Sequence, residues 1–92
     1  MLVADFLIDD ENIEKFWGHG VSVAQVLQVL DNSFVVVPNR KNRRALYLII
    51  GRDVSGQCIT IPVESTYDPV LWRPVTAWLC KASEAARLPR LR

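Results

Sequence analysis

Four side chains in this sequence are of types that can perform acid–base or phosphate chemistry. Histidine serves as a general acid or base because its ordinary pKa lies near neutral pH, and His19 is the only histidine in the chain. Arg52, Glu64 and Arg73 have strongly apolar neighbours, and a charge in such a place either pairs with another charge or faces a ligand. Cleavage of RNA without a metal needs a base for the 2′-hydroxyl, cations for the phosphorane and an acid for the leaving oxygen. The candidate catalytic residues are therefore His19, Arg52, Glu64 and Arg73.

Each of these candidates also has a structural interpretation. His19 lies between Gly18 and Gly20, where its ring can hold a corner between two helices by hydrogen bonds. Glu64 can form an ion pair with an arginine inside the fold. The sequence leaves both interpretations open.

A second group of residues has the composition of a nucleic-acid surface. Four bases lie close together in a short segment, and two aromatic side chains lie further along the chain. Such cations can follow phosphates, and aromatic rings can stack on unpaired bases. The candidate RNA-binding residues are Arg40, Lys41, Arg43, Arg44, Tyr47 and Trp78. The alternatives are a solvated loop and aromatic rings in the core, where we expect Trp17.

The charges of the chain are distributed unevenly. The 92 residues carry a net charge of +1, from 11 Lys and Arg against 10 Asp and Glu. Residues 1–33 contain six acidic residues and one basic residue, whereas residues 34–92 contain ten basic and four acidic residues. The first segment therefore has a net charge of −5 and the second +6. This asymmetry is consistent with an anionic partner for the basic segment or with mutual attraction of the two halves.

The composition excludes several classes of protein. No apolar run approaches the roughly 18–20 residues of a membrane helix, and residues 1–10 are acidic where a signal peptide is basic. Cys58 and Cys80 form no Cys-x-x-Cys pair, and a zinc site with a single histidine is disfavoured. We therefore expect a cytoplasmic protein without metal or cofactor and with reduced cysteines, in which a disulfide is possible but not needed.

The elements that position these residues begin with two helices. A short strand is expected over Asp5–Ile8, after which Asp9 or Asp10 can cap a helix that ends at Gly18. Ser22 begins a second helix, in which Gln25 three residues later completes a capping box.

Strands and a last helix follow. The predicted strands span Phe34–Val37, Ala45–Ile50, Gln57–Glu64 and Leu71–Thr76, and the last helix spans Ala77–Leu88. Gly51 and Gly56 bracket a hairpin connection, where glycine permits unusual φ values. Pro62 cannot donate a ladder hydrogen bond and is expected at an edge or bulge. Strands joined by hairpins are antiparallel, so we expect a single α+β domain over residues 1–92, with 88–92 as a loose tail.

Three segments together resemble the BrnT family of bacterial type II toxins. Ile8–Lys15 followed by His19–Ser22 resembles the Asp/Glu-Asn helix and His-Gly-Val-Ser turn with which that family begins. Tyr47–Arg52 followed by Gly56 resembles its Leu-x-Ile-Gly-Arg…Gly hairpin. Arg73–Ala77, with Glu84 seven residues later, resembles its closing Arg-x-Ile/Val-Ser/Thr-Ala…Glu segment. The resemblance covers approximately residues 6–88.

The resemblance implies a RelE-like fold, in which two N-terminal helices pack on an antiparallel sheet of about four strands and a short helix closes the chain. It also implies a metal-independent endoribonuclease that inhibits translation and growth. Its partner would be a cognate antitoxin of the ribbon-helix-helix type. Toxin and antitoxin would form a hetero-oligomer that contacts DNA only through the antitoxin. His19, Arg52 and Arg73 match residues of the family motifs, whereas Glu64 is a candidate only by its position.

The resemblance breaks at one position that matters for catalysis. The family segment continues with an arginine where this chain has Trp78. Removal of one preorganised charge donor can lower a rate by about 10²–10³. The alternative function is therefore a weak or inactive toxin-like binding module that acts through its antitoxin.

Overall fold

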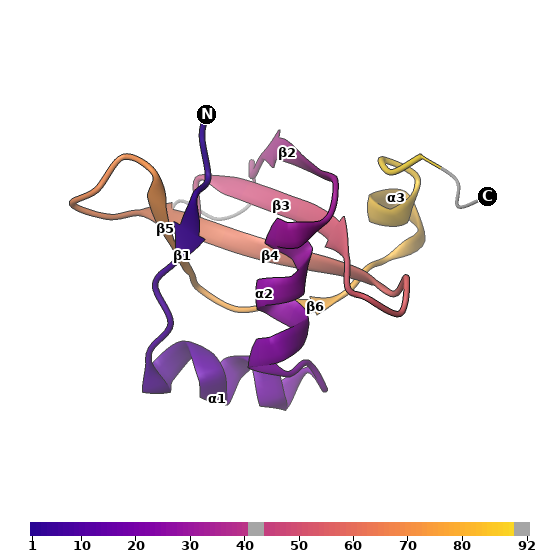
Figure 1. The fold of residues 1–92 in the computed structure, drawn as a ribbon, viewed down its shortest axis with the longest axis horizontal. Coiled ribbons are helices and arrows are strands. Elements are labelled where there is room, and N and C mark those ends of the chain that lie inside the picture. The colour runs from indigo at the N-terminus through magenta and orange to yellow at the C-terminus, as the bar shows by residue number, and fades with distance from the viewer. Residues whose placement is uncertain (41–43, 90–92) are drawn as a thin grey trace.

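The computed structural model describes residues 1–40 and 44–89, which form a mixed α+β domain (Figure 1). Its helices and strands are β1 (Asp5–Phe6), α1 (Asp10–Gly18), α2 (Val23–Asp31), β2 (Phe34–Pro38), β3 (Tyr47–Arg52), β4 (Cys58–Ser65), β5 (Leu71–Pro74), β6 (Trp78–Leu79) and α3 (Ala82–Ala85). Within these residues the strands form one six-stranded sheet in the order β1-β5-β4-β3-β2, and β6 pairs with β4 beyond the end of β5.

Both N-terminal helices begin where local sequence signals place them. Asp9 is the N-cap of α1, and its side chain accepts a hydrogen bond from the backbone N–H of Asn12 at 2.8 Å. Ser22 and Gln25 form the predicted capping box at the start of α2. These caps satisfy backbone donors that have no partner inside a helix.

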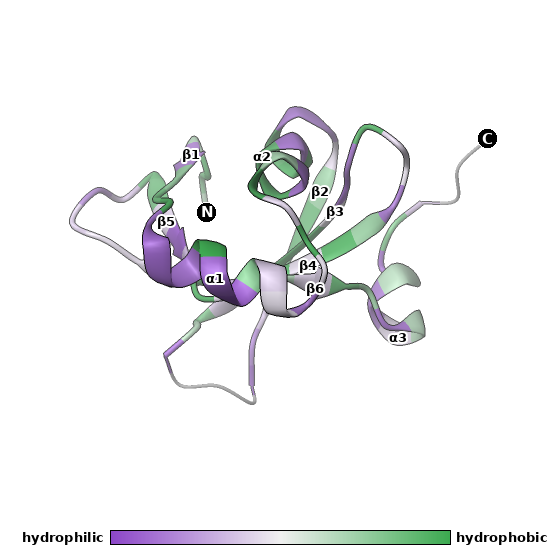
Figure 2. Cartoon of the chain, turned by 90° about the horizontal axis from the view of Figure 1, so that it is seen from below, coloured by the Kyte–Doolittle hydropathy of each residue, from purple (hydrophilic) through white to green (hydrophobic). Residues whose placement is uncertain are grey.

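The core lies between the two helices and one face of the sheet. Phe16 of α1 and Val26 and Val29 of α2 are fully buried against Ile49 and Ile61 of the central strands. Figure 2 shows β3 and β4 largely in green, while the first turn of α1 is purple. The prediction that Trp17 belongs to this core is wrong, because its side chain is 65% exposed. Phe16 alone points fully inward from the end of α1.

The sheet is larger than predicted and is not purely antiparallel. β1 pairs in parallel with β5, with Asp5 opposite Leu71, so the expected hairpin meander accounts only for β2 to β5. β4 lies in the centre, so of the two places predicted for Pro62, an edge strand or a bulge, the edge strand is wrong. On one side of β4, residues 63–65 pair with β5 and residues 59–60 pair with β6. Pro62 lies between these two paired segments, where its missing N–H costs no ladder hydrogen bond.

The β3–β4 hairpin is organised by Asp53 rather than by two glycines. The Oδ1 atom of Asp53 accepts hydrogen bonds from the Ser55 hydroxyl at 2.7 Å and from the Gln57 backbone at 2.9 Å. Burial raises the pKa of this carboxyl, but its hydrogen bonds outweigh burial and lower the pKa overall. Gly56 has the expected positive φ of 87°. Gly51 does not, since it lies inside β3.

Gly51 is needed for close approach of α2 to the sheet. A Cβ at this position would lie 2.6 Å from Cγ1 of Val29 and 3.0 Å from Cβ of Phe34. We expect Gly51→Ala to lower the free energy of unfolding by about 1–3 kcal/mol, as overpacking does, measured by urea denaturation. Gly18→Ala is the control, because no atom lies within 4 Å of its added methyl. An equally stable Gly51→Ala variant would contradict this packing.

The C-terminal segment differs most from its prediction. Instead of one helix over Ala77–Leu88, residues 78–79 form β6 and only residues 82–85 form the short helix α3. A disulfide between Cys58 and Cys80 joins this segment to β4, so the prediction of reduced cysteines is wrong. Leu88 is buried and Pro89 accepts a hydrogen bond, so the predicted loose tail does not begin at residue 88.

Candidate functional site

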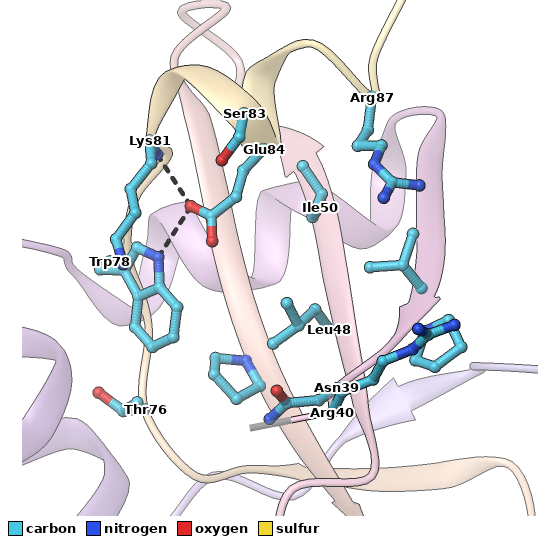
Figure 3. A pocket seen from close by; sticks show the side chains of 13 residues that line it. Asn39, Arg40, Leu48, Ile50, Thr76, Trp78, Lys81, Ser83, Glu84 and Arg87 are labelled. Carbon is cyan, nitrogen blue, oxygen red and sulfur yellow. Dashed lines mark hydrogen bonds between the residues drawn. The ribbon is translucent and has the colours of Figure 1, made fainter. Parts of the chain in front are cut away.

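The sheet face away from α1 and α2 carries a pocket of about 670 Å³, which we call the sheet pocket. Leu48 and Ile50 of β3 lie in its centre, between Trp78 and Lys81 on one side and Arg40 on the other (Figure 3). This volume is in the range of small-molecule and nucleotide sites. The sheet pocket therefore combines an apolar centre with a charged margin.

The charged margin is mainly cationic. Arg40, Lys81 and Arg87 line the sheet pocket together with one acidic residue, Glu84. Three cations against one carboxylate give this surface a positive charge, which attracts phosphates. Thr76 also lines the pocket, and its buried hydroxyl oxygen finds no hydrogen-bond partner among the described residues.

Glu84 organises the wall of the pocket. Its Oε1 atom accepts hydrogen bonds from Nε1 of Trp78 at 3.0 Å, from the backbone N–H of Lys81 at 2.8 Å and from the Thr60 hydroxyl at 3.0 Å. Lys81 Nζ lies 5.9 Å from the centre of the Trp78 ring, within the range of a cation–π contact. The carboxylate thus fixes the indole and the lysine relative to each other.

His19 lies beside the sheet pocket. Its ring meets the Trp78 ring edge-on, with 6.2 Å between the ring centroids. The residue is exposed at the C-terminal end of α1, where its backbone N–H caps the helix. His19 does not line the sheet pocket, but of the four candidate catalytic residues it is the one whose ring contacts a pocket-lining side chain, that of Trp78.

Arg73 and Glu64 belong to a separate ion-pair network. The Arg73 guanidinium donates to both carboxylate oxygens of Asp9, at 2.7 and 3.2 Å, and to Glu64 at 3.1 Å. Glu64 also pairs with Arg44 at 2.9 Å, and Glu11 lies within 3.5 Å of both arginines. The structural interpretation of the Arg73–Glu64 pair is thus the one that the geometry supports.

Arg52 contacts Pro89, which follows α3, rather than joining Arg73. It donates a hydrogen bond of 2.9 Å to the carbonyl oxygen of Pro89. Arg52 lies opposite Cys58, and Arg73 opposite Glu64. Since strands rise about 3.3 Å per residue, the two arginines are separated by about 20 Å along β4. They do not converge on one phosphate.

The predicted RNA-binding residues are divided by the structure. Arg40 and Trp78 line the sheet pocket, whereas Arg44 is engaged with carboxylates. Tyr47 packs edge-on against Trp72 on the helix-covered face and cannot stack on a base in the pocket. The remaining two predictions, Lys41 and Arg43, lie outside the described residues.

Comparison of the chain with family models, curated proteins and solved structures finds no match. The interpretation of the sheet pocket therefore rests on its own residues. In the described part of the chain, no helix is long and apolar enough to cross a membrane, and no group of three or more histidine, cysteine or acidic side chains is placed to hold a metal.

Sequence reasoning missed three pocket residues, Lys81, Glu84 and Arg87, as members of the site. All three lie in the helix that the sequence predicts over Ala77–Leu88, and that helix gives no reason for their side chains to meet at the sheet. The available signal was Trp78, an aromatic residue followed by a lysine and an acidic residue, but only the turn from β6 into α3 directs these side chains to the sheet.

Proposed function

We propose that this chain is the toxin of a bacterial type II toxin–antitoxin pair and binds RNA in the sheet pocket, where it acts as a metal-independent endoribonuclease. The observation that carries this proposal is the convergence of three cations and Trp78 on one open sheet face, with His19 against the Trp78 ring. Cations bind the phosphates, and the indole offers a ring on which an unpaired base can stack.

The proposed chemistry assigns the proton transfer to His19. Its exposed imidazole can take the proton of a 2′-hydroxyl or give one to the leaving oxygen. Lys81, Arg87 and Arg40 stabilise the charge that develops on the phosphorane. Glu84 is a positioning residue, because it holds Trp78 and Lys81. Arg52, Glu64 and Arg73 have structural roles in this proposal.

The resemblance to BrnT toxins adds to the proposal. Two N-terminal helices packed on one sheet face are consistent with a RelE-like arrangement, although the sheet has more strands than expected. A cognate antitoxin of the ribbon-helix-helix type is the proposed partner, and RNA as substrate implies action in the bacterial cytoplasm. A short gene beside this one that encodes such an antitoxin would support the pairing.

A toxin-like binding module without catalytic activity is the second candidate. It is favoured by the distance between Arg52 and Arg73 and by the carboxylates that surround Arg73. In that case the sheet pocket binds RNA or an acidic segment of the antitoxin, but no phosphodiester bond is broken.

RNA binding and cleavage by the purified protein test both candidates. With a single-stranded RNA and a metal chelator, we expect cleavage by the wild type and a rate about 10²–10⁴-fold lower for His19→Ala, with RNA affinity nearly unchanged. The Lys81→Ala/Arg87→Ala double variant should bind RNA about tenfold more weakly. The slope of log affinity against log salt concentration should be less steep by the amount that about two phosphate contacts contribute.

Lys15→Ala is the matched control, since it removes an exposed lysine from α1, away from the pocket. Binding that depends on Lys81 and Arg87 without any cleavage would favour the binding module. Absence of RNA binding, together with normal growth of bacteria that express the protein, would contradict both candidates.

A further inference from the structure

One wall of the sheet pocket is attached to the sheet through a disulfide. Residues 78–87, here called the pocket wall, supply Trp78, Lys81, Glu84 and Arg87 to the pocket. The disulfide joins Cys80 of this wall to Cys58 at the start of β4. Beside it, the Cys80 backbone N–H donates to the Cys58 carbonyl oxygen at 3.0 Å.

The pocket wall has little stability of its own. Its helix, α3, has four residues, none of which is buried. A helix of this length does not persist in water, because nucleation is unfavourable and too few hydrogen bonds follow. Besides the Cys58–Cys80 connection, the wall is tied to β4 by the pairing of Trp78 and Leu79 in β6 and by the hydrogen bond between Thr60 and Glu84. Residues 81–87, which follow the disulfide, have only the second of these ties. The next firm anchor is the buried side chain of Leu88.

Cys80 is also part of the polar contacts that shape the wall. Its Sγ atom lies 3.3 Å from the Thr60 hydroxyl, which in turn donates to Glu84. The sulfur atoms, the threonine and the carboxylate therefore form one continuous set of contacts that ends at the Trp78 indole. A change at the disulfide reaches the pocket through this set.

We infer that Cys58 and Cys80 form a redox switch that assembles the sheet pocket in the oxidised protein and loosens it in the reduced protein. Its consequence for RNA rests on the proposed function. Reduction by two equivalents of a low-molecular-weight thiol adds two electrons and two protons. The Cys58–Cys80 bond breaks, two thiols form, and the reductant leaves as its own disulfide. Oxidation by a disulfide of the same class reverses these changes.

The switch has a direction that follows from its surroundings. Both cysteines are half-buried, so a small thiol can approach them. Thiol pools keep cytosolic cysteines mostly reduced, so a pocket in that compartment would be loosened until conditions become oxidising. RNA binding would then increase with oxidation.

Amide hydrogen exchange of the full chain, before and after treatment with dithiothreitol, tests this inference without RNA. We expect the amides of residues 84–87 to exchange at least about tenfold faster after reduction, because without the disulfide the opened segment gains conformational freedom and its opening costs less free energy. The amides of β3 and β4 should keep their protection. A Cys58→Ser/Cys80→Ser variant should behave like the reduced protein and show no response to dithiothreitol.

RNA affinity measured on the same samples separates this inference from the proposed function. Faster exchange in the wall together with about tenfold weaker RNA binding would support both. Faster exchange without RNA binding in either state would support the switch and contradict the proposed function. Unchanged exchange after complete reduction, free thiols in the oxidised sample, or loss of protection throughout β3 and β4 would each overturn the switch.

Discussion

Arg73→Met is expected to lower the free energy of unfolding by about 2–4 kcal/mol. Removal of one partner from a largely buried ion pair leaves the other charges unpaired and costs about 3–5 kcal/mol in fully buried cases. The Arg73 side chain is only 11% exposed, but its partners Asp9 and Glu11 are 39% and 56% exposed, so the effect should be smaller here. Urea denaturation at neutral pH measures it.

The pH dependence of the same variant distinguishes electrostatics from lost packing. Hydrogen bonds from Arg73, and then from the Asn12 backbone, hold the pKa of Asp9 below its ordinary value of 3.8. A carboxyl with a lowered folded pKa stabilises the protein above its unfolded pKa and loses this contribution as the pH falls through the folded pKa. The wild type should therefore lose stability below about pH 4, and Arg73→Met should lose less.

Two further variants serve as controls for Arg73. Lys15→Met removes an exposed cation that lies 3.9 Å from Glu11 and should have an effect of less than about 0.5 kcal/mol. Glu64→Gln combined with Arg73→Met should recover a small part of the loss, because Glu64 has then lost one of its two arginine partners and keeps only Arg44. A loss below about 1 kcal/mol for Arg73→Met would contradict the assigned role. If the role is correct, an inactive Arg73 variant reports on folding and not on phosphate binding.

Asn12→Asp is expected to be still more damaging, by about 3–5 kcal/mol at neutral pH, since it places a carboxylate in a buried site. Asn12 is fully buried, and its amide donates to the carbonyl oxygens of Leu7 at 2.9 Å and Pro74 at 3.1 Å. These bonds fix the start of α1 to the end of β5. A carboxylate has no hydrogen to donate and would face two carbonyl oxygens.

This variant should depend on pH in the opposite direction to Asp9. Burial raises the folded pKa of the new carboxyl, so its cost is smallest below the unfolded value near 3.9 and grows by about 1.4 kcal/mol per pH unit above it. Thermal unfolding at several pH values measures this slope. Gln57→Glu makes the same amide-to-acid change at an exposed position and should show no such slope. A pH-independent loss would contradict a buried carboxylate.

Short-range features of the fold were predictable from the sequence because their causes are local. A helix cap involves residues three positions apart, as Ser22 and Gln25 do. The period of β4 follows from the alternation of Ile59, Ile61 and Val63 with the residues between them, whereas β3 is a short continuous apolar run. The observed strand ends differ from the predicted ones by one or two residues, because hydrogen bonding with a neighbouring strand decides each boundary.

The prediction of a final helix was wrong because pairing with the distant strand β4 outweighed the local helix preference. Residues 77–88 have a composition that suits a helix, but Trp78 and Leu79 pair with β4 and Cys80 bonds to Cys58, 22 residues earlier. Local patterns carry no information on such pairings. The prediction that Trp17 is buried was wrong for a related reason, since an amphipathic pattern does not show how much of the helix surface the sheet covers.

The sequence indicated which residue types form the candidate site but not which of these residues lie together in the fold. Trp78 and Arg40 line the sheet pocket, as their chemistry suggested. Arg73 had the expected apolar neighbours, but Asp9, its main partner, is 64 residues away. The parallel β1–β5 pairing and the hydrogen bond from Asn12 to Pro74 bring Asp9 next to Arg73, and no local pattern in the sequence indicates that pairing.

That parallel pairing also determines when the domain can fold during synthesis. β1 is synthesised before the other strands of this sheet, yet its neighbour is β5. The hydrogen bond from the Trp72 indole to the Leu2 carbonyl oxygen joins residues 70 positions apart. Contacts this distant form slowly because a long segment must be ordered first. β1 of the nascent chain thus has no neighbouring strand until most of the domain has been translated. A ribosome that stalls before residue 71 carries a chain that cannot complete its sheet.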